Sequence, residues 1–330
     1  MATQDDLARV ADRKARSALL LAGAPALFVL LWSTGFIGAK FGLPFAPPLT
    51  FLLVRFACVI AILACLAFAL RRPWPHTPEQ WFHIAIAGVL LHGGYLSGVF
   101  LAIHNGMPTG AVALIVGVQP LLTAFLSASM VGERVSGRQW AGLLLGFGGV
   151  ALVVGDKMGI AAAGPDLVSG ASVAGLAFSA LALLSITLGT LYQKRHCAEL
   201  DLWSGSVIQF AAAALALLPF ALAFESMHIE WSGQFLFALA WLIVVLSLGA
   251  ISLLHLLIRR GAATRVSALF YLTPPTTALL AWLLFGETLR LAAIAGMAIA
   301  AVGVAIAVRQ PSLPTALPQA GEGSGKSSGS

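Results

Sequence analysis

Arg55 is a charged side chain inside a long apolar run, and a charge at membrane depth is costly unless it has a partner. It lies about seven residues from the start of that run, which corresponds to ~10 Å along a helix. A guanidinium offers a fork of donors that suits a carboxylate, so one interpretation makes Arg55 the contact for an anionic ligand. The alternative is structural: the side chain extends toward the membrane surface or caps free carbonyl groups.

His92 and His255 also fall within apolar runs, whereas no Asp or Glu lies deep in one. Proton relays inside membranes usually need a buried titratable group, so coupling to protons would have to use one of these imidazoles. The alternative is that each histidine is a structural group with satisfied ring nitrogens. Passive exchange or facilitated diffusion remains open from the sequence.

Further side chains at this depth combine an apolar body with one or two hydrogen-bonding groups, which would orient an amphipathic ligand. The alternative is packing between helices or an aromatic belt at the membrane interface, an interpretation favoured for Trp282. Together with Arg55 and His92, the candidate binding residues are Trp32, Tyr95, Gln119, Gln209, Tyr271 and Thr273.

Prolines interrupt two of the apolar runs near their middles: Pro120 in one, and Pro274 with Pro275 in another. Each removes backbone hydrogen bonds, and free carbonyl groups are tolerated in a membrane only beside protein or a water-filled cavity. We therefore expect these prolines to kink helices that line a central pathway. A simple packing kink is the alternative.

Composition excludes a water-soluble domain, because 59% of the 330 residues are hydrophobic, 10% are charged and mean hydropathy is +0.93. The net charge of +6 is spread between apolar runs, which argues against nucleic-acid binding. Runs long enough to cross a membrane as helices number ten. They cover 24–42, 48–70, 80–104, 107–131, 136–155, 172–194, 202–224, 234–258, 261–286 and 289–308.

Basic residues between these runs predict the orientation, because positively charged loops stay in the cytoplasm. With a cytoplasmic N-terminal tail (1–23), fifteen Lys and Arg lie inside and three lie outside, Lys40, Lys157 and Arg290. Lys40 is expected to anchor a helix at the interface. The segment 156–171 is then a periplasmic linker, and 309–330 is a second cytoplasmic tail whose Pro, Gly and Ser content favours disorder.

A shift of 154 positions superimposes the two halves of the chain without a gap. It places Pro120 on Pro274, Glu133 on Glu287 and Gly142 on Gly296, among others. The halves, 24–155 and 172–308, each hold five expected helices, an odd number, so the second half must enter the membrane from the opposite side. Inverted repeats of this kind are typical of secondary transporters that expose a central site alternately.

Two pairs in this alignment are expected to serve structure. Glu133 and Glu287 precede the next helix and would complement its positive N-terminal dipole. Gly142 and Gly296 belong to small-residue spacings that let membrane helices approach closely. They favour packing of the fourth helix with the fifth and the ninth with the tenth, or alternatively a seam between the chains of a homodimer.

Enzyme machinery is not visible in the apolar segments, which contain no HExxH, no GxSxG and no paired intramembrane aspartates. The three cysteines lack metal-ligand spacing, so no metal or cofactor is expected. A membrane-embedded enzyme or a non-transporting scaffold remains the alternative to a transporter.

Several of these features together resemble a known family: Trp32 to Phe36 with Lys40, Arg55 with Phe56, and each proline followed by Gly-Glu. The chain is similar to the drug/metabolite transporter superfamily, in its EamA-type branch. The resemblance implies an all-α protein of ten transmembrane helices in the bacterial cytoplasmic membrane. It implies a small-molecule substrate, with export of amino acids or related metabolites. The second half departs from the pattern, because Gln209 replaces the arginine and 185–188 lacks the tryptophan.

Overall fold

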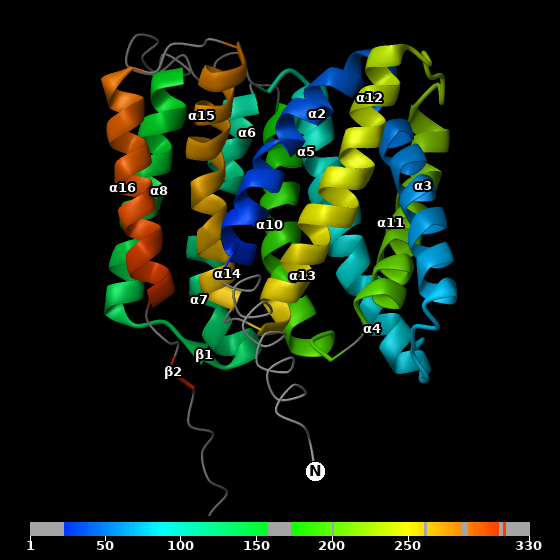
Figure 1. Cartoon of the computed structure of the whole chain (residues 1–330), viewed down its shortest axis with the longest axis horizontal. Coiled ribbons are helices and arrows are strands. Elements are labelled where there is room, and N and C mark those ends of the chain that lie inside the picture. Colours follow the sequence, from blue (N-terminus) through cyan, green and yellow to red (C-terminus); the bar gives the residue numbers. More distant parts are fainter. Residues whose placement is uncertain are drawn as a thin grey trace, which may run out of the picture.

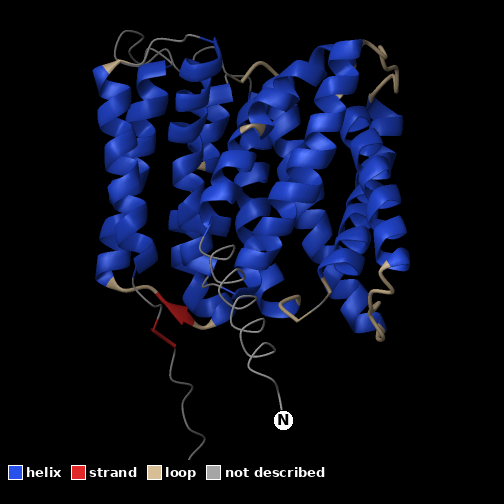
Figure 2. Cartoon of the chain, in the orientation of Figure 1, coloured by secondary structure: helices blue, strands red, loops and turns tan. Residues whose placement is uncertain are grey.

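The computed structural model describes residues 23–107, 109–157, 173–199, 201–260, 263–285, 290–309 and 313–314. It is a bundle of helices, and its strands, β1 (Glu133–Arg134) and β2 (Leu313–Pro314), have two residues each (Figures 1 and 2). Among the described residues, eight helices are long and apolar enough to span a membrane. The all-α membrane class predicted from composition is therefore confirmed.

Each expected run in the first half is helical, within a few residues of its predicted bounds. Prediction 24–42 corresponds to a helix Gly23–Ser33 and α2. The elements that follow are α2 (Gly35–Gly42), η1 (Leu43–Phe45), α3 (Pro48–Ala69), α4 (Pro78–Gly88), η2 (Val89–Gly94), α5 (Tyr95–His104), α6 (Thr109–Val116), α7 (Gln119–Val131) and α8 (Gly137–Lys157).

The second half repeats this order, including a π-helix in its third helical segment, η4, as in η2 of the first half. Its elements are α10 (Val173–His196), α11 (Leu202–Phe224), α12 (Gly233–Trp241), η4 (Leu242–Ala250), α13 (Ile251–Arg260), α14 (Ala263–Ala268), η5 (Leu269–Leu272), α15 (Thr273–Phe285) and α16 (Leu291–Arg309). The π-helices are of interest because such wide turns are frequent at functional sites.

The prolines break their helices instead of bending them. α6 ends at Val116, and Pro120 lies in the first turn of α7. In the second half the 3₁₀ turn η5 separates α14 from α15, and Pro274 and Pro275 lie in the first turn of α15. Proline lacks the backbone N–H that an interior turn needs, but the first turn of a helix leaves those groups unbonded anyway.

Glycines pack α8 against α16 at one side of the bundle, at the left of Figure 1. A Cβ on Gly142 would lie 2.7 Å from the backbone N of Ala307, and one on Gly296 would lie 2.8 Å from the carbonyl O of Gly149. The predicted pairing of the fourth helix with the fifth and the ninth with the tenth is therefore wrong for these residues. The glycines join the fifth helix to the tenth, a contact that helical spacing alone does not identify.

Glu133 also differs from its prediction. Its carboxylate accepts the backbone N–H of Ala263, at 3.0 Å, at the start of α14 and not at the start of α8. Burial raises the pKa of this carboxyl, against the lowering effect of the hydrogen bond from Ala263. Glu133 thus complements the dipole of a helix in the other half of the chain. Glu287, its counterpart, lies outside the described residues.

The opposite side of the bundle, at the right of Figure 1, is formed by α3 and α11, which pack against each other. Glu225, just after α11, accepts the backbone N–H groups of Leu49 and Thr50 at the start of α3, at 2.8 and 2.7 Å. Asp201 caps α11 and pairs with Arg72, which follows α3. Each helix start is thus held by an acidic residue, which matches the positive end of its dipole.

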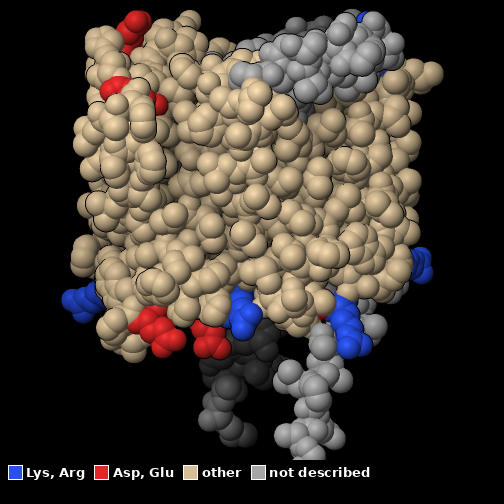
Figure 3. All heavy atoms as spheres, turned by 180° about the vertical axis from the view of Figure 1, so that it is seen from behind, with Lys and Arg blue, Asp and Glu red and all other residues tan. Residues whose placement is uncertain are grey.

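Charged side chains lie at the two ends of the bundle on the face seen in Figure 3, and the band between them carries none. The exposed side chains of the bundle include large apolar ones, such as Phe125 and Leu215, each 71% exposed. An apolar belt between charged rims is the surface that a lipid bilayer covers.

Candidate functional site

Arg55 lies inside the bundle, with 3% of the residue exposed. Its Nε donates a hydrogen bond of 3.0 Å to the hydroxyl of Ser247, which belongs to η4 in the other half. No Asp or Glu in the described part of the chain forms a salt bridge with Arg55. A buried guanidinium with only a neutral partner is expensive, so the site is suited to receive an anion.

Aromatic side chains line the same cavity as Arg55. Trp32 stacks on Tyr95 with ring centroids 6.2 Å apart and an interplanar angle of 14°. Phe270 meets Trp32 edge to face at 5.2 Å. Trp32, Arg55 and Tyr95 line a cavity of about 40 Å³ together with Leu242 and Leu246. The arrangement places one cationic group at the margin of a mostly apolar chamber.

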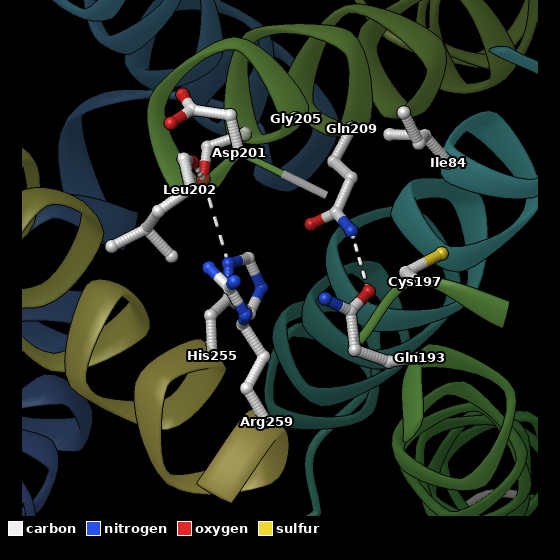
Figure 4. Close-up of a pocket in the computed structure, with 10 residues that line it drawn as sticks. Ile84, Gln193, Cys197, Asp201, Leu202, Gly205, Gln209, His255 and Arg259 are labelled. Carbon is white, nitrogen blue, oxygen red and sulfur yellow. Dashed lines mark hydrogen bonds between the residues drawn. The ribbon is translucent and has the colours of Figure 1, made fainter. Parts of the chain in front are cut away.

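Polar side chains from four helical segments form a second group. His92 Nε2 lies 3.3 Å from Gln209 Oε1, and Gln209 Nε2 donates to Gln193 Oε1 at 2.6 Å. His255 Nδ1 lies 3.4 Å from the hydroxyl of Ser206. Gln209 and His255 line a small cavity of about 10 Å³, where Figure 4 shows the Gln209 and Gln193 amides turned toward each other.

Gln119 lies in a third group, on α7 against α14. Its Nε2 donates to Thr123 Oγ1 at 3.2 Å and to Ser267 Oγ at 3.0 Å. Its Oε1 is buried and lacks a hydrogen-bond partner within the described residues. Thr273 is buried as well, and its carbonyl accepts a hydrogen bond from Ser33. Neither Gln119 nor Thr273 lines the Arg55 cavity.

Two other candidates lie away from the cavities around Arg55 and Gln209. The ring of Tyr271 packs against Gly146 and Phe147 of α8, and its buried hydroxyl has no partner within the described ranges. Trp282 is 46% exposed on the outside of the bundle, in agreement with the interpretation favoured for it. The side chain of Lys40 lies outside what the structure describes.

The structure thus brings together six of the residues chosen from the sequence, in two adjoining groups, and leaves Gln119, Tyr271 and Thr273 elsewhere. It adds partners that the sequence did not single out, namely Gln193, Ser206, Ser247 and Phe270. Ser247 had a signal, because it is a polar residue within the apolar run 234–258. Its pairing with Arg55 depends on a contact between the halves.

Comparison with known proteins places this geometry in context. The EamA-like transporter family matches residues 17–155 and 173–309. The transporter YvbV of Bacillus subtilis is 28% identical over 86% of this chain and 88% of its own length. The inner membrane transporter YedA of Escherichia coli K12 is 26% identical over 83% of this chain and 86% of its own.

An Escherichia coli K12 protein named "Probable amino-acid metabolite efflux pump" is 26% identical over 80% of this chain and 86% of its own. A crystal structure that covers 86% of this chain and 95% of its own aligns with a TM-score of 0.67 at 22% identity, which shows the fold alone. Because the family covers both halves of the bundle and both groups of buried polar residues, the chain belongs to the EamA-like transporter family.

Proposed function

We propose that this multi-pass transporter exports amino acids or related small metabolites, and that Arg55 binds the carboxylate of its substrate. The buried, unpaired charge of Arg55 carries the proposal. Burying a cation without a counter-ion costs several kcal/mol, and an arriving carboxylate offsets that cost with a bidentate, charge-assisted pair. Since Ser247 holds Nε, the two Nη groups remain for the substrate.

The remaining walls of the cavity support an amphipathic substrate. Trp32 and Tyr95 offer flat faces, while Leu242 and Leu246 are aliphatic. Such a chamber favours an apolar side chain next to a carboxylate, as in many amino acids. The efflux pump of Escherichia coli, whose name assigns it amino-acid metabolites, is one of the relatives that cover most of this chain.

We further propose ten membrane helices in two inverted repeats. Contacts between the halves support the repeat. Arg55 and Gln209 lie 154 positions apart, and each reaches the π-helix of the other half: Arg55 bonds Ser247 in η4, and Gln209 bonds His92 in η2. The same shift carries η2 onto residues 243–248, inside η4. Reciprocal contacts of this kind are expected when two related halves pack around a common centre.

Alternating access is the mechanism that we propose for these two halves. The cavity of about 40 Å³ has room for a few water molecules, since one needs about 10–15 Å³. In our proposal the halves move apart to widen this cavity for the substrate. We place the end with Arg72 and Asp201 in the cytoplasm of a bacterial inner membrane, as the basic residues predict.

Counterflow in proteoliposomes tests this function. Vesicles preloaded with one unlabelled amino acid or organic cation at a time receive the same compound in labelled form. We expect saturable exchange for carboxylate compounds with an apolar side chain, and none for cations that lack a carboxylate. Protein-free vesicles give the background.

Arg55→Gln is the variant to compare, with Arg138→Gln as a matched control because Arg138 is exposed at the start of α8. The Arg55 variant should lose at least ten-fold in exchange, and the control should lose nothing. Exchange of cations alone, or full exchange by a folded Arg55→Gln protein, contradicts the proposal.

A further inference from the structure

Two buried imidazoles face each other across the halves of the chain. His92 belongs to η2 and His255 to α13, each is 2% exposed, and their ring centroids are 6.0 Å apart. His92 also stacks on Phe210 at 4.1 Å, which fixes the plane of its ring. We call His92 and His255 the histidine pair.

The hydrogen bonds around His92 determine which nitrogen carries its hydrogen. Gln209 Nε2 donates to Gln193, so Gln209 turns its carbonyl oxygen toward His92 Nε2. An amide oxygen only accepts, and neutral His92 must therefore be protonated at Nε2. Its Nδ1 then carries no hydrogen and can only accept a hydrogen bond. That nitrogen is buried and lacks a hydrogen-bond partner within the described residues.

The same reasoning applies to His255. The hydroxyl of Ser206 donates its one hydrogen to the carbonyl of Leu202 at 2.7 Å, so it can only accept from His255 Nδ1. Neutral His255 is therefore protonated at Nδ1, and its Nε2 is the bare acceptor. This nitrogen, too, is buried and unpartnered in the part of the chain that the structure describes.

We propose that the histidine pair is a proton-binding site that takes up one proton when a carboxylate binds at Arg55. Each ring presents one bare acceptor nitrogen that can hold a proton. Burial opposes the charged form, so the negative charge of a carboxylate at Arg55 is needed to stabilise the proton there. A second proton is opposed by the charge of the first, so the pair titrates as a unit.

A small cavity lies between His255 and Asp201. The cavity of about 10 Å³ touches His255, Gln209 and Ser206, and it also touches Asp201 near the end of the bundle. That volume admits about one water molecule. A water there would connect the histidine pair with the end of the bundle that we place in the cytoplasm.

The charges around the histidine pair determine the sign of the coupling. Arg55 on α3 opposes a proton on His92, and Arg259 on α13 opposes one on His255. Tyr95 on α5 and Gln193 on α10 are neutral, while Asp201 before α11 is already paired with Arg72. A carboxylate on Arg55 cancels one opposing charge, so proton and carboxylate strengthen each other's binding. This coupling rests on the proposed carboxylate contact.

Nitrogen NMR of the full-length protein, with ¹⁵N-histidine and in lipid nanodiscs, tests the site without any substrate. Loss of a signal in His92→Gln or His255→Gln assigns it. At high pH we expect the hydrogen on Nε2 of His92 and on Nδ1 of His255. On acidification the pair should take up one proton first, and His255→Gln should shift the titration of His92.

Arg55→Gln provides the coupling test, because it removes the opposing charge as a bound carboxylate would. We expect the proton affinity of the histidine pair to rise about ten-fold, a midpoint shift of about one pH unit. Arg138→Gln, far from the pair, should leave the midpoint unchanged. If the histidine variants do not fold, Arg259→Gln should raise the affinity as well.

Opposite tautomers, independent titration of the two rings, or an unchanged midpoint in both arginine variants would overturn the proposal. Since the titration needs no substrate, it is independent of the counterflow result. Carboxylate exchange together with a failed titration means that transport is not coupled through these histidines. A successful titration without carboxylate exchange leaves the proton site standing and removes the proposed substrate.

Discussion

At the scale of single residues, the central feature is a cation that the chain itself does not neutralise. The depth of Arg55 within the membrane was predicted, because the position along a helix is read directly from the sequence. Its burial inside the bundle needed the structure, because depth does not determine which face of the helix a residue occupies. Its partner Ser247 was not predicted, since 192 residues separate the two and no local pattern joins them. The hydrogen bond between Gln193 and Gln209 was likewise not predicted, because no local pattern joins residues on two different helices.

Ser247→Ala should weaken the positioning of Arg55 without removing its charge. The Nε group loses its acceptor, and an unsatisfied buried donor costs about 1–3 kcal/mol. We expect a lower thermal midpoint and an apparent affinity for the exchanged amino acid reduced several-fold, with exchange still measurable at high concentration. Ser127 offers the comparison, because Ser127→Ala removes a buried hydroxyl on α7 that belongs to neither the Arg55 cavity nor the histidine pair. Equal apparent affinity in Ser247→Ala and the wild type would show that the serine does not position Arg55.

At the scale of elements, the sequence predicted where helices run but not which helices pair. Helices occupy the described part of each expected apolar run, because length and hydropathy determine them locally. The partners of Gly142 and Glu133 were assigned to chain neighbours, whereas the structure gives them to α16 and α14. Contacts between the halves depend on how the two halves of the chain pack against each other, which periodicity does not encode. The dimer seam stays untested, and these glycines pack within one chain.

Gly149→Ala tests the packing of α8 on α16. A Cβ at this position meets the backbone of Ala300 and Gly296, neither of which can move aside without displacing the helix. Overpacking of this kind costs about 1–3 kcal/mol, so the thermal midpoint in detergent should fall. Gly148 is the matched control, since a Cβ there meets nothing within 4 Å. A fall of the same size in Gly148→Ala would mean that helix flexibility, not the contact with α16, is responsible.

At the scale of the whole molecule, two halves of similar order meet around buried polar groups that belong to both. Composition was enough to predict a membrane bundle, and motif spacing was enough to predict the family that the comparisons show. The location of the centre needed the structure, because Gln119 and Thr273 align with each other in the repeat yet lie away from Arg55. Equivalent positions in the two halves thus do not have equivalent surroundings.

The central claim is that Arg55 recognises a carboxylate, and a comparison of two probes tests it most directly. Counterflow of an exchanged amino acid is measured beside its carboxamide, which has the same side chain and ammonium group but no anionic charge. We expect the wild-type protein to prefer the amino acid at least ten-fold, and folded Arg55→Gln to lose this preference. Equal exchange of both compounds by the wild type, or an unchanged preference in Arg55→Gln, would contradict it.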